Sequence, residues 1–118
     1  MHALYLAFLN SWHGLVHGAR TERAVRLELA LLALGVPLAL LLGSGLWVRV
    51  ALVASLLLML TAEFLNTAVE KLCDHLHPAR HPKIGIVKDL ASAGTFSAQG
   101  IAALVWIAAL IERLSGQP

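Results

Sequence analysis

Three long apolar segments restrict this chain to an all-helical fold inside a membrane. They cover residues 29–42, 46–62 and 90–111. The first is short, and the other two are near the about 20 residues that cross a bilayer as a helix. Because lipid offers no hydrogen-bond partners, the backbone N–H and C=O groups of such a segment must bond to one another, as they do in a helix. The chain is 58% hydrophobic and 14% charged, and its mean hydropathy is +0.76. We therefore predict an integral membrane protein with one domain, residues 1–118, whose three-span region covers residues 29–111.

The connections between the spans are predicted from turn residues. Gly43-Ser44-Gly45 predicts a tight turn, which makes the first two spans antiparallel neighbours. Between Asp74 and Lys88 the sequence is polar and contains two prolines. Prolines disfavour a continuing helix, so we predict a polar loop here and a third span that begins near Leu90.

Residues 1–19 have the periodicity of an amphipathic helix. The apolar side chains on one face are Tyr5, Phe8, Leu9, Trp12, Leu15, Val16 and Ala19, and the polar side chains opposite are Asn10, His13, His17 and Arg20. Such a helix lies in the membrane interface with its apolar face towards lipid. We expect residues 1–27 to form this surface segment; packing of the helix against the bundle is the alternative.

Lysine and arginine residues predict the orientation of the spans. Three arginines lie in residues 20–26, and the second connection carries Lys71, Arg80, Lys83 and Lys88, whereas the opposite end has only Arg49 and Arg113. By the positive-inside rule, the N-terminus and the 74–88 connection face the cytoplasm. The net charge of +2 is too small and too scattered to indicate a nucleic-acid partner.

A stripe of polar residues follows the second apolar segment. Glu63, Asn66, Glu70 and Asp74 are spaced by three, four and four residues, so they share one face of a helix. Acids at a membrane span are costly to bury without partners. A bound cation with an anionic ligand explains the stripe; a helix end that becomes polar where it meets water is the alternative.

The predicted cytoplasmic layer also contains Glu22, Glu28, Lys88 and Asp89. Carboxylates hold Mg²⁺ together with phosphate oxygens. A lysine neutralises phosphate charge, and a further carboxylate can accept a proton from an attacking hydroxyl. Handling of a magnesium–nucleotide complex is therefore one hypothesis for the function.

Two further hypotheses come from the same residues. A metal-binding membrane protein is indicated by a cluster in the sequence, namely Cys73, His75, His77 and His81, although this spacing matches no firm zinc pattern and surface histidines also explain it. A small non-enzymatic bundle, such as a subunit or assembly factor, is the third. It predicts that Glu63 and Lys88 are replaceable without loss of function.

Several motifs together resemble the prokaryotic diacylglycerol kinase family. They are Ser11-Trp12-His13-Gly14-Leu15, Glu22, Arg26-Leu27-Glu28, Glu63-Phe64-Leu65-Asn66-Thr67-Ala68-Val69-Glu70, Asp74 and Lys88-Asp89-Leu90-Ala91-Ser92-Ala93. The resemblance covers nearly the whole chain. It implies a three-span lipid kinase with an amphipathic N-terminal helix, assembled as a homotrimer whose active sites are shared between protomers.

The resemblance also implies roles by matching position. Glu63 would be the general base that takes the proton of the lipid hydroxyl, and Asn66 would order the centre between Glu63 and Glu70. Glu22 and Glu70 would hold Mg²⁺ against the ATP phosphates. The residues expected at the nucleotide are Ser11, Glu22, Glu70, Arg80, His81, Lys88 and Asp89, and those expected at the lipid are Glu28, Glu63, Asn66 and Ser92.

The implied reaction is direct in-line transfer of the γ-phosphoryl group of ATP to a lipid alcohol. Diacylglycerol, which would become phosphatidic acid, is the expected acceptor. A polyprenol such as undecaprenol is the alternative, because relatives of this fold process both.

Overall fold

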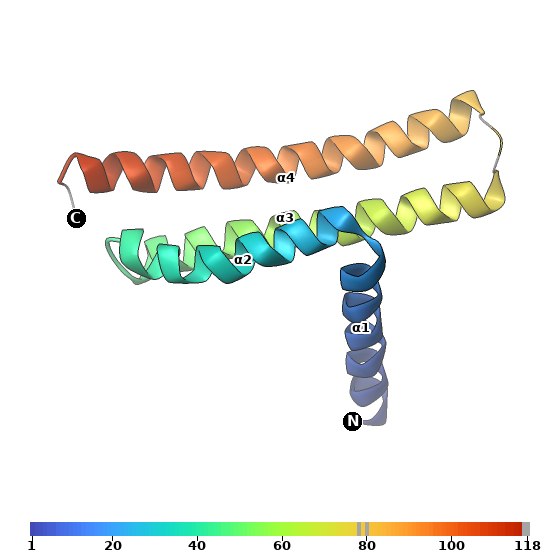
Figure 1. Ribbon diagram of the computed structural model, residues 1–118, viewed down its shortest axis with the longest axis horizontal. Helices are drawn as coiled ribbons and strands as arrows, with labels where there is room; N and C mark the ends of the chain where they lie inside the picture. Colours follow the sequence, from blue (N-terminus) through green and yellow to red (C-terminus); the bar gives the residue numbers. More distant parts are fainter. Residues whose placement is uncertain (78, 80, 117–118) are drawn as a thin grey trace.

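The computed structural model describes residues 1–77, 79 and 81–116, and these residues form an all-helical fold (Figure 1). The helices are α1 (His2–Thr21), α2 (Arg23–Leu42), α3 (Leu46–Leu76) and α4 (Pro82–Leu114). Of these, α2, α3 and α4 are long and apolar enough to cross a membrane. The predicted fold class, an N-terminal helix followed by three spans, is confirmed, and the protein is a multi-pass membrane protein.

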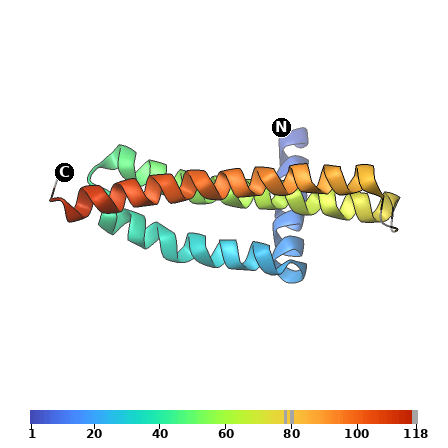
Figure 2. The same cartoon turned by 90° about the horizontal axis from the view of Figure 1, so that it is seen from above.

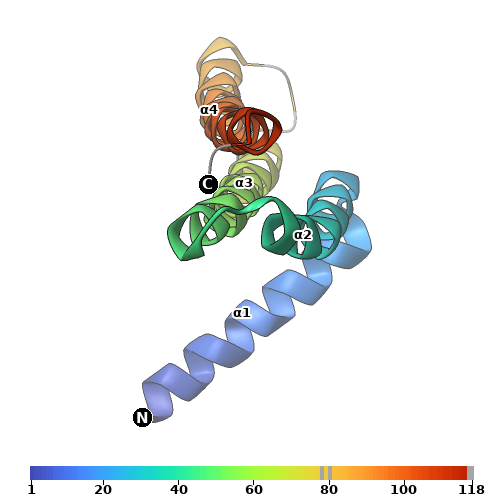
Figure 3. The same ribbon diagram turned by 90° about the vertical axis from the view of Figure 1, so that its left-hand side faces the viewer.

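The first helix ends where the chain turns towards the membrane. Glu22 has an extended backbone, with φ −116° and ψ 117°, and separates α1 from α2. The guanidinium of Arg26 donates to the carbonyls of Ala19 at 3.3 Å and Arg20 at 3.1 Å. These bonds satisfy carbonyl groups that the end of α1 leaves free. Residues 23–27 therefore belong to α2 and not to the surface helix, and α1 projects away from the spans (Figure 3).

The turn between α2 and α3 lies where the sequence predicts it. Residues 43–45 lie between the end of α2 at Leu42 and the start of α3 at Leu46. The backbone of Gly43 is tightly surrounded. A Cβ added to this residue would lie 2.9 Å from the carbonyl oxygen of Ala39 and would also meet the side chain of Arg49. A glycine is therefore needed at this position.

The second connection is much shorter than predicted, because α3 continues to Leu76 and α4 begins at Pro82. The prediction of a loop from Asp74 to Lys88 was wrong. A proline is tolerated in the first turn of a helix, where its missing N–H leaves no bond unmade, so Pro82 starts α4 instead of preventing it. The side chain of His81 caps this start, since its Nδ1 accepts a hydrogen bond from the Lys83 backbone N–H at 3.2 Å.

The three spans pack around α3, which contacts both α2 and α4. In the view from above, α4 lies over α3 while α2 runs beside them (Figure 2). A buried cluster of Ala39, Leu52 and Ala109 joins the three helices. The indole N–H of Trp106 on α4 donates to the Leu52 carbonyl at 3.2 Å and to Ser55 Oγ at 3.1 Å. This polar contact fixes α4 against α3 inside an apolar layer.

Helix length places the polar end of the bundle outside the lipid. The 33 residues of α4 correspond to about 50 Å at about 1.5 Å per residue, against a hydrocarbon core of about 30 Å. Helices of this length therefore extend beyond the apolar layer, and we expect the acidic stripe of α3 to lie where this helix leaves it.

Candidate active site

Two carboxyl groups on neighbouring helices are buried at the start of the polar end. Glu28 of α2 and Glu63 of α3 are each 8% exposed. The Glu63 carboxylate accepts a hydrogen bond from the Thr67 hydroxyl at 3.4 Å, whereas Oε1 of Glu28 has no hydrogen-bond partner in the described part of the chain. Two site residues that lie 35 positions apart (63 − 28 = 35) in the sequence are therefore both buried within the helical bundle.

The next residues of the stripe lie one and two turns further along α3. The side-chain amide of Asn66 donates to Oε1 of Glu70 at 2.9 Å. Its own carbonyl oxygen is buried, and no described residue bonds to it. An apolar groove of about 270 Å³ between α3 and α4 begins beside Asn66; its lining residues are Ala62, Leu65, Asn66, Val69, Ala91, Gly94 and Thr95. Asn66 therefore lies both on the acidic stripe and at the edge of this apolar groove.

Glu22 connects the α1–α2 junction to α3. Its carboxylate forms an ion pair with Nζ of Lys71 at 2.7 Å. The hydrogen bond from Lys71 holds the pKa of Glu22 below its ordinary value. Glu70, in contrast, is bonded to Asn66 on its own helix. The two expected magnesium ligands therefore have different partners within one chain.

A polar cavity lies at the far end of the α3–α4 pair. Its volume is about 340 Å³, and its lining residues are Asp74, His77, Ala79, His81, Ile84, Gly85, Lys88 and Asp89. It brings together three residues expected at the nucleotide, namely His81, Lys88 and Asp89. Lys88 forms an ion pair with Asp74 across the cavity. The imidazole rings of His77 and His81 are 4.9 Å apart, tilted by 45°.

The remaining predicted site residues do not contact these groups in the described part of the chain. Ser11 is exposed on α1, and Ser92 is exposed on α4. Neither makes a side-chain hydrogen bond with the other site residues that the structure describes. Arg80, expected at the nucleotide, lies outside the described residues.

Sequence reasoning missed the partners of the charged groups. It used Lys71 only to predict the orientation of the spans and not as the partner of Glu22, and it did not place Asp74 opposite Lys88. It also missed His77 as a wall of the polar cavity. The signal for Asp74 was present, since it ends the same stripe as Glu63 and Glu70.

The alternative of a dedicated zinc site gains no support. Across residues 1–77, 79 and 81–116, no group of three or more His, Cys, Asp or Glu side chains is placed to hold a metal ion. Cys73 is buried, while His75 and His77 are exposed. These residues do not converge as zinc ligands do.

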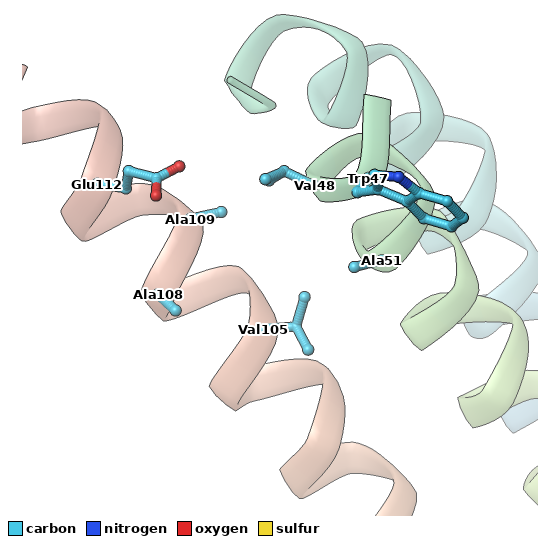
Figure 4. A pocket seen from close by; sticks show the side chains of 7 residues that line it. All are labelled: Trp47, Val48, Ala51, Val105, Ala108, Ala109 and Glu112. Carbon is cyan, nitrogen blue, oxygen red and sulfur yellow. The ribbon is translucent and has the colours of Figure 1, made fainter. Parts of the chain in front are cut away.

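The opposite end of the bundle is chemically different. A groove of about 360 Å³ lies there between α3 and α4 (Figure 4), and its lining residues are Trp47, Val48, Ala51, Val105, Ala108, Ala109 and Glu112. Glu112 is its one acid and accepts a hydrogen bond from Ser44 Oγ at 2.7 Å. The described residues at this end therefore have none of the carboxylate and lysine groupings of the polar end.

Comparison with known proteins agrees with the geometry. The prokaryotic diacylglycerol kinase family matches residues 9–110. The chain belongs to this family. It is 35% identical over 96 residues to a diacylglycerol kinase of Haemophilus influenzae, with 81% of each chain covered. It is 33% identical over 96 residues to a diacylglycerol kinase of Escherichia coli K12, which covers 81% of this chain and 79% of the relative. A diacylglycerol kinase of Pseudomonas aeruginosa is 33% identical over 98 residues, with 83% of this chain and 80% of the relative covered.

Membership of the prokaryotic diacylglycerol kinase family makes this chain a lipid kinase. The matched region extends from the middle of α1 almost to the end of α4. It contains the buried carboxyl pair, the acidic stripe and the polar cavity. The non-enzymatic bundle is therefore excluded.

Proposed function

We propose that the protein transfers the γ-phosphoryl group of ATP directly to a lipid alcohol at the cytoplasmic face of a bacterial inner membrane. Diacylglycerol is the proposed acceptor, and phosphatidic acid the product. The observation that carries the proposal is the order of groups along α3: a buried acid, Glu63, at the edge of the apolar layer, followed by a polar cavity beyond it. Curated relatives that carry the name diacylglycerol kinase support the choice of acceptor.

The two substrates approach this helix from different solvents. Glu63 and Asp74 are eleven residues apart, which is about 16 Å along a helix at about 1.5 Å per residue. A lipid hydroxyl reaches the level of Glu63 from the membrane, and the groove beside Asn66 is the proposed approach. ATP reaches the polar cavity from water. The phosphate chain then extends from the cavity towards Glu63.

Glu63 is the proposed general base. A lipid hydroxyl is a weak acid, so a carboxylate that accepts its proton assists the attack on phosphorus. In the in-line transfer the lipid oxygen forms a bond to the γ-phosphorus while the bond from phosphorus to the ADP oxygen breaks, and the hydroxyl proton moves to Glu63.

Lys88 is the proposed phosphate ligand. Its ammonium group already lies in the cavity, bound to Asp74. Phosphate oxygens would replace the Asp74 carboxylate as its partner, since a lysine ammonium is a compact positive charge suited to phosphate. A cavity of about 340 Å³ is at the lower end of the about 300–1,000 Å³ of ligand sites.

We propose that Mg²⁺ binds carboxylates that lie between Glu63 and the polar cavity. Glu22 and Glu70 would hold the ion; both carboxylates are accessible, and both offer the oxygen ligands that Mg²⁺ prefers. The side chain of Asn66 is bonded to Glu70, and its carbonyl oxygen, which has no partner among the described residues, could offer a further oxygen. When bound, the ion neutralises charge on the phosphates. Glu22 would exchange its bond with Lys71 for this role.

A homotrimer with active sites shared between protomers is part of the proposal. Within one chain Glu22 and Glu70 face different partners, so a neighbouring protomer is the proposed source of the second carboxylate. The spans also expose large apolar side chains, such as Leu34 at 68% and Phe96 at 77%, which suit lipid or a second copy.

The test is phosphate transfer from γ-labelled ATP by the purified protein in lipid vesicles. The acceptors are diacylglycerol, undecaprenol and a vesicle without added alcohol, and the matched control protein is Lys88→Met. We expect labelled phosphatidic acid with the parent protein and little with the variant. Faster labelling of undecaprenol would move the function to a polyprenol kinase. Absence of any labelled lipid would overturn the proposal.

A further inference from the structure

The polar cavity between α3 and α4 has two chemically different parts. One part is ionic and contains the ion pair of Lys88 with Asp74, together with Asp89. The other part contains the imidazole rings of His77 and His81 among small or aliphatic residues. The proposed phosphate contact uses the ionic part, so a ligand group for the two rings has still to be assigned.

The two imidazole rings lie against each other. Their centroids are 4.9 Å apart with a tilt of 45°, which is within the about 4.5–7 Å of paired aromatic rings. The ring of His81 is fixed, because its Nδ1 accepts a hydrogen bond from the Lys83 backbone N–H at 3.2 Å. His77 is exposed at the end of α3, where its backbone N–H donates to the Cys73 carbonyl at 2.8 Å. The cavity wall therefore contains an accessible ring beside a fixed one.

The order of groups along both helices places these rings at one end of the cavity. On α3, His77 is three residues beyond Asp74 (77 − 74 = 3), and His81 precedes Lys88 by seven residues (88 − 81 = 7). These spacings are about 4 Å and about 10 Å at about 1.5 Å per residue of helix. In both cases the histidine is nearer to the α3–α4 connection, so the rings lie at the end of the cavity that is distant from Glu63.

A nucleotide has the same order of groups, with phosphates at one end and a flat aromatic base at the other. If phosphates bind Lys88 and extend towards Glu63, the base lies towards the connection, where the rings are. Nucleotide bases stack on aromatic side chains, because each base has a π-face. The ionic part of the cavity and its aromatic part thus match the two ends of one ligand.

We propose that His77 is a base-binding residue whose ring stacks on the adenine of ATP, with His81 supporting its position. This inference rests on the proposed function, in which ATP occupies the cavity and Lys88 binds its phosphates. The family resemblance assigned His81 to the nucleotide and gave His77 no role. The proposal therefore adds a determinant of donor binding that comes from the end of α3.

Three variants test the contact through the Kd for a non-hydrolysable ATP analogue, measured by calorimetry. His77→Ala removes the ring, and His77→Phe keeps an aromatic ring without imidazole nitrogens. His75→Ala is the matched control, since His75 is an exposed histidine near the same helix end that does not line the cavity. Loss of a stacked aromatic side chain corresponds to about 5- to 150-fold in Kd. We expect this increase in His77→Ala, and values within about threefold of the parent in the other two variants.

Inorganic triphosphate separates the base from the phosphates, because it has the phosphate chain alone. Its inhibition constant against ATP should be the same in His77→Ala as in the parent protein, and should rise in Lys88→Met. Equal weakening of ATP and triphosphate in His77→Ala would show that His77 binds phosphate. A His77→Phe protein as weak as His77→Ala would show that the imidazole nitrogens are required. Either result would overturn the proposal.

Turnover distinguishes this inference from the proposed function. At saturating ATP the kcat of His77→Ala should stay within about threefold of the parent value, because the ring contacts the base and not the transferred phosphoryl group. If the parent phosphorylates lipid and His77→Ala binds the ATP analogue as His75→Ala does, the stacking proposal alone is wrong. If the parent labels no lipid, the proposed function fails, and the comparison of Kd values still tests the contact between His77 and the base.

Discussion

Replacement of Glu63 by glutamine is the most informative single change. The two side chains have the same shape, and the glutamine carbonyl can still accept the hydrogen bond from Thr67. The buried position of residue 63 therefore stays filled, and the helices should remain folded. The variant lacks only a group that can take up a proton, and loss of a general base reduces turnover by about 10²- to 10⁴-fold.

Nucleotide binding should respond much less, because the proposed ATP ligands lie elsewhere. The polar cavity contains Asp74, which is eleven residues beyond Glu63 on α3, and this is about 16 Å of helix at about 1.5 Å per residue. We expect the Kd for ATP in Glu63→Gln to stay within about threefold of the parent value, which corresponds to less than about 1 kcal/mol.

The assay is single-turnover phosphorylation of diacylglycerol beside ATP binding by calorimetry. Glu112→Gln is the matched control, since Glu112 is an acid at the opposite end of the bundle. Turnover of Glu63→Gln within a few-fold of this control would show that Glu63 is structural. Loss of ATP binding in parallel with turnover would refute the proposal that the base and the nucleotide lie at separate positions along α3.

Three further predictions follow from the same geometry. Glu22→Gln or Glu70→Gln should raise the Mg²⁺ concentration required for half-maximal rate and lower turnover, measured by magnesium titration of the kinase assay. Co-assembly of inactive Glu63→Gln chains with inactive Lys88→Ala chains should restore part of the activity if one site takes these residues from different protomers. Trp106→Phe should lower the free energy of unfolding in detergent by about 0.5–1.5 kcal/mol, because it removes the indole donor to α3 and leaves the aromatic bulk in place.

Each of these has a clear contrary result. Unchanged magnesium dependence in both variants would remove Glu22 and Glu70 from the metal site. Cross-linking that finds only monomers in an active preparation would exclude shared sites. A loss of stability no larger than that of Trp47→Phe, at an indole that is 80% exposed, would show that the Trp106 hydrogen bonds contribute nothing.

The metal site and the roles of the single residues stay predictions, but much of the arrangement was predictable from local sequence patterns. Apolar length predicted three spans, Gly43 to Gly45 predicted the hairpin turn, and the spacing of Glu63, Asn66 and Glu70 predicted their common helix face. These features depend on residues at most a few helical turns apart, and helix periodicity determines such relations without reference to the rest of the chain. Where the same reasoning treated Pro82 as a helix breaker it was wrong, since the effect of a proline depends on its position within the helix.

Only the tertiary structure decided which charged groups meet. Glu22 binds Lys71, and Lys88 binds a carboxylate that precedes it by fourteen residues. Each meeting joins different segments of the chain, so it depends on how far each helix is rotated about its axis and where the helices cross. Those variables are set by packing, such as the contact of Gly18 with Phe64, where an added Cβ would lie 2.8 Å from the ring. A one-dimensional pattern contains the residues of the site, and side-chain packing between helices selects their partners.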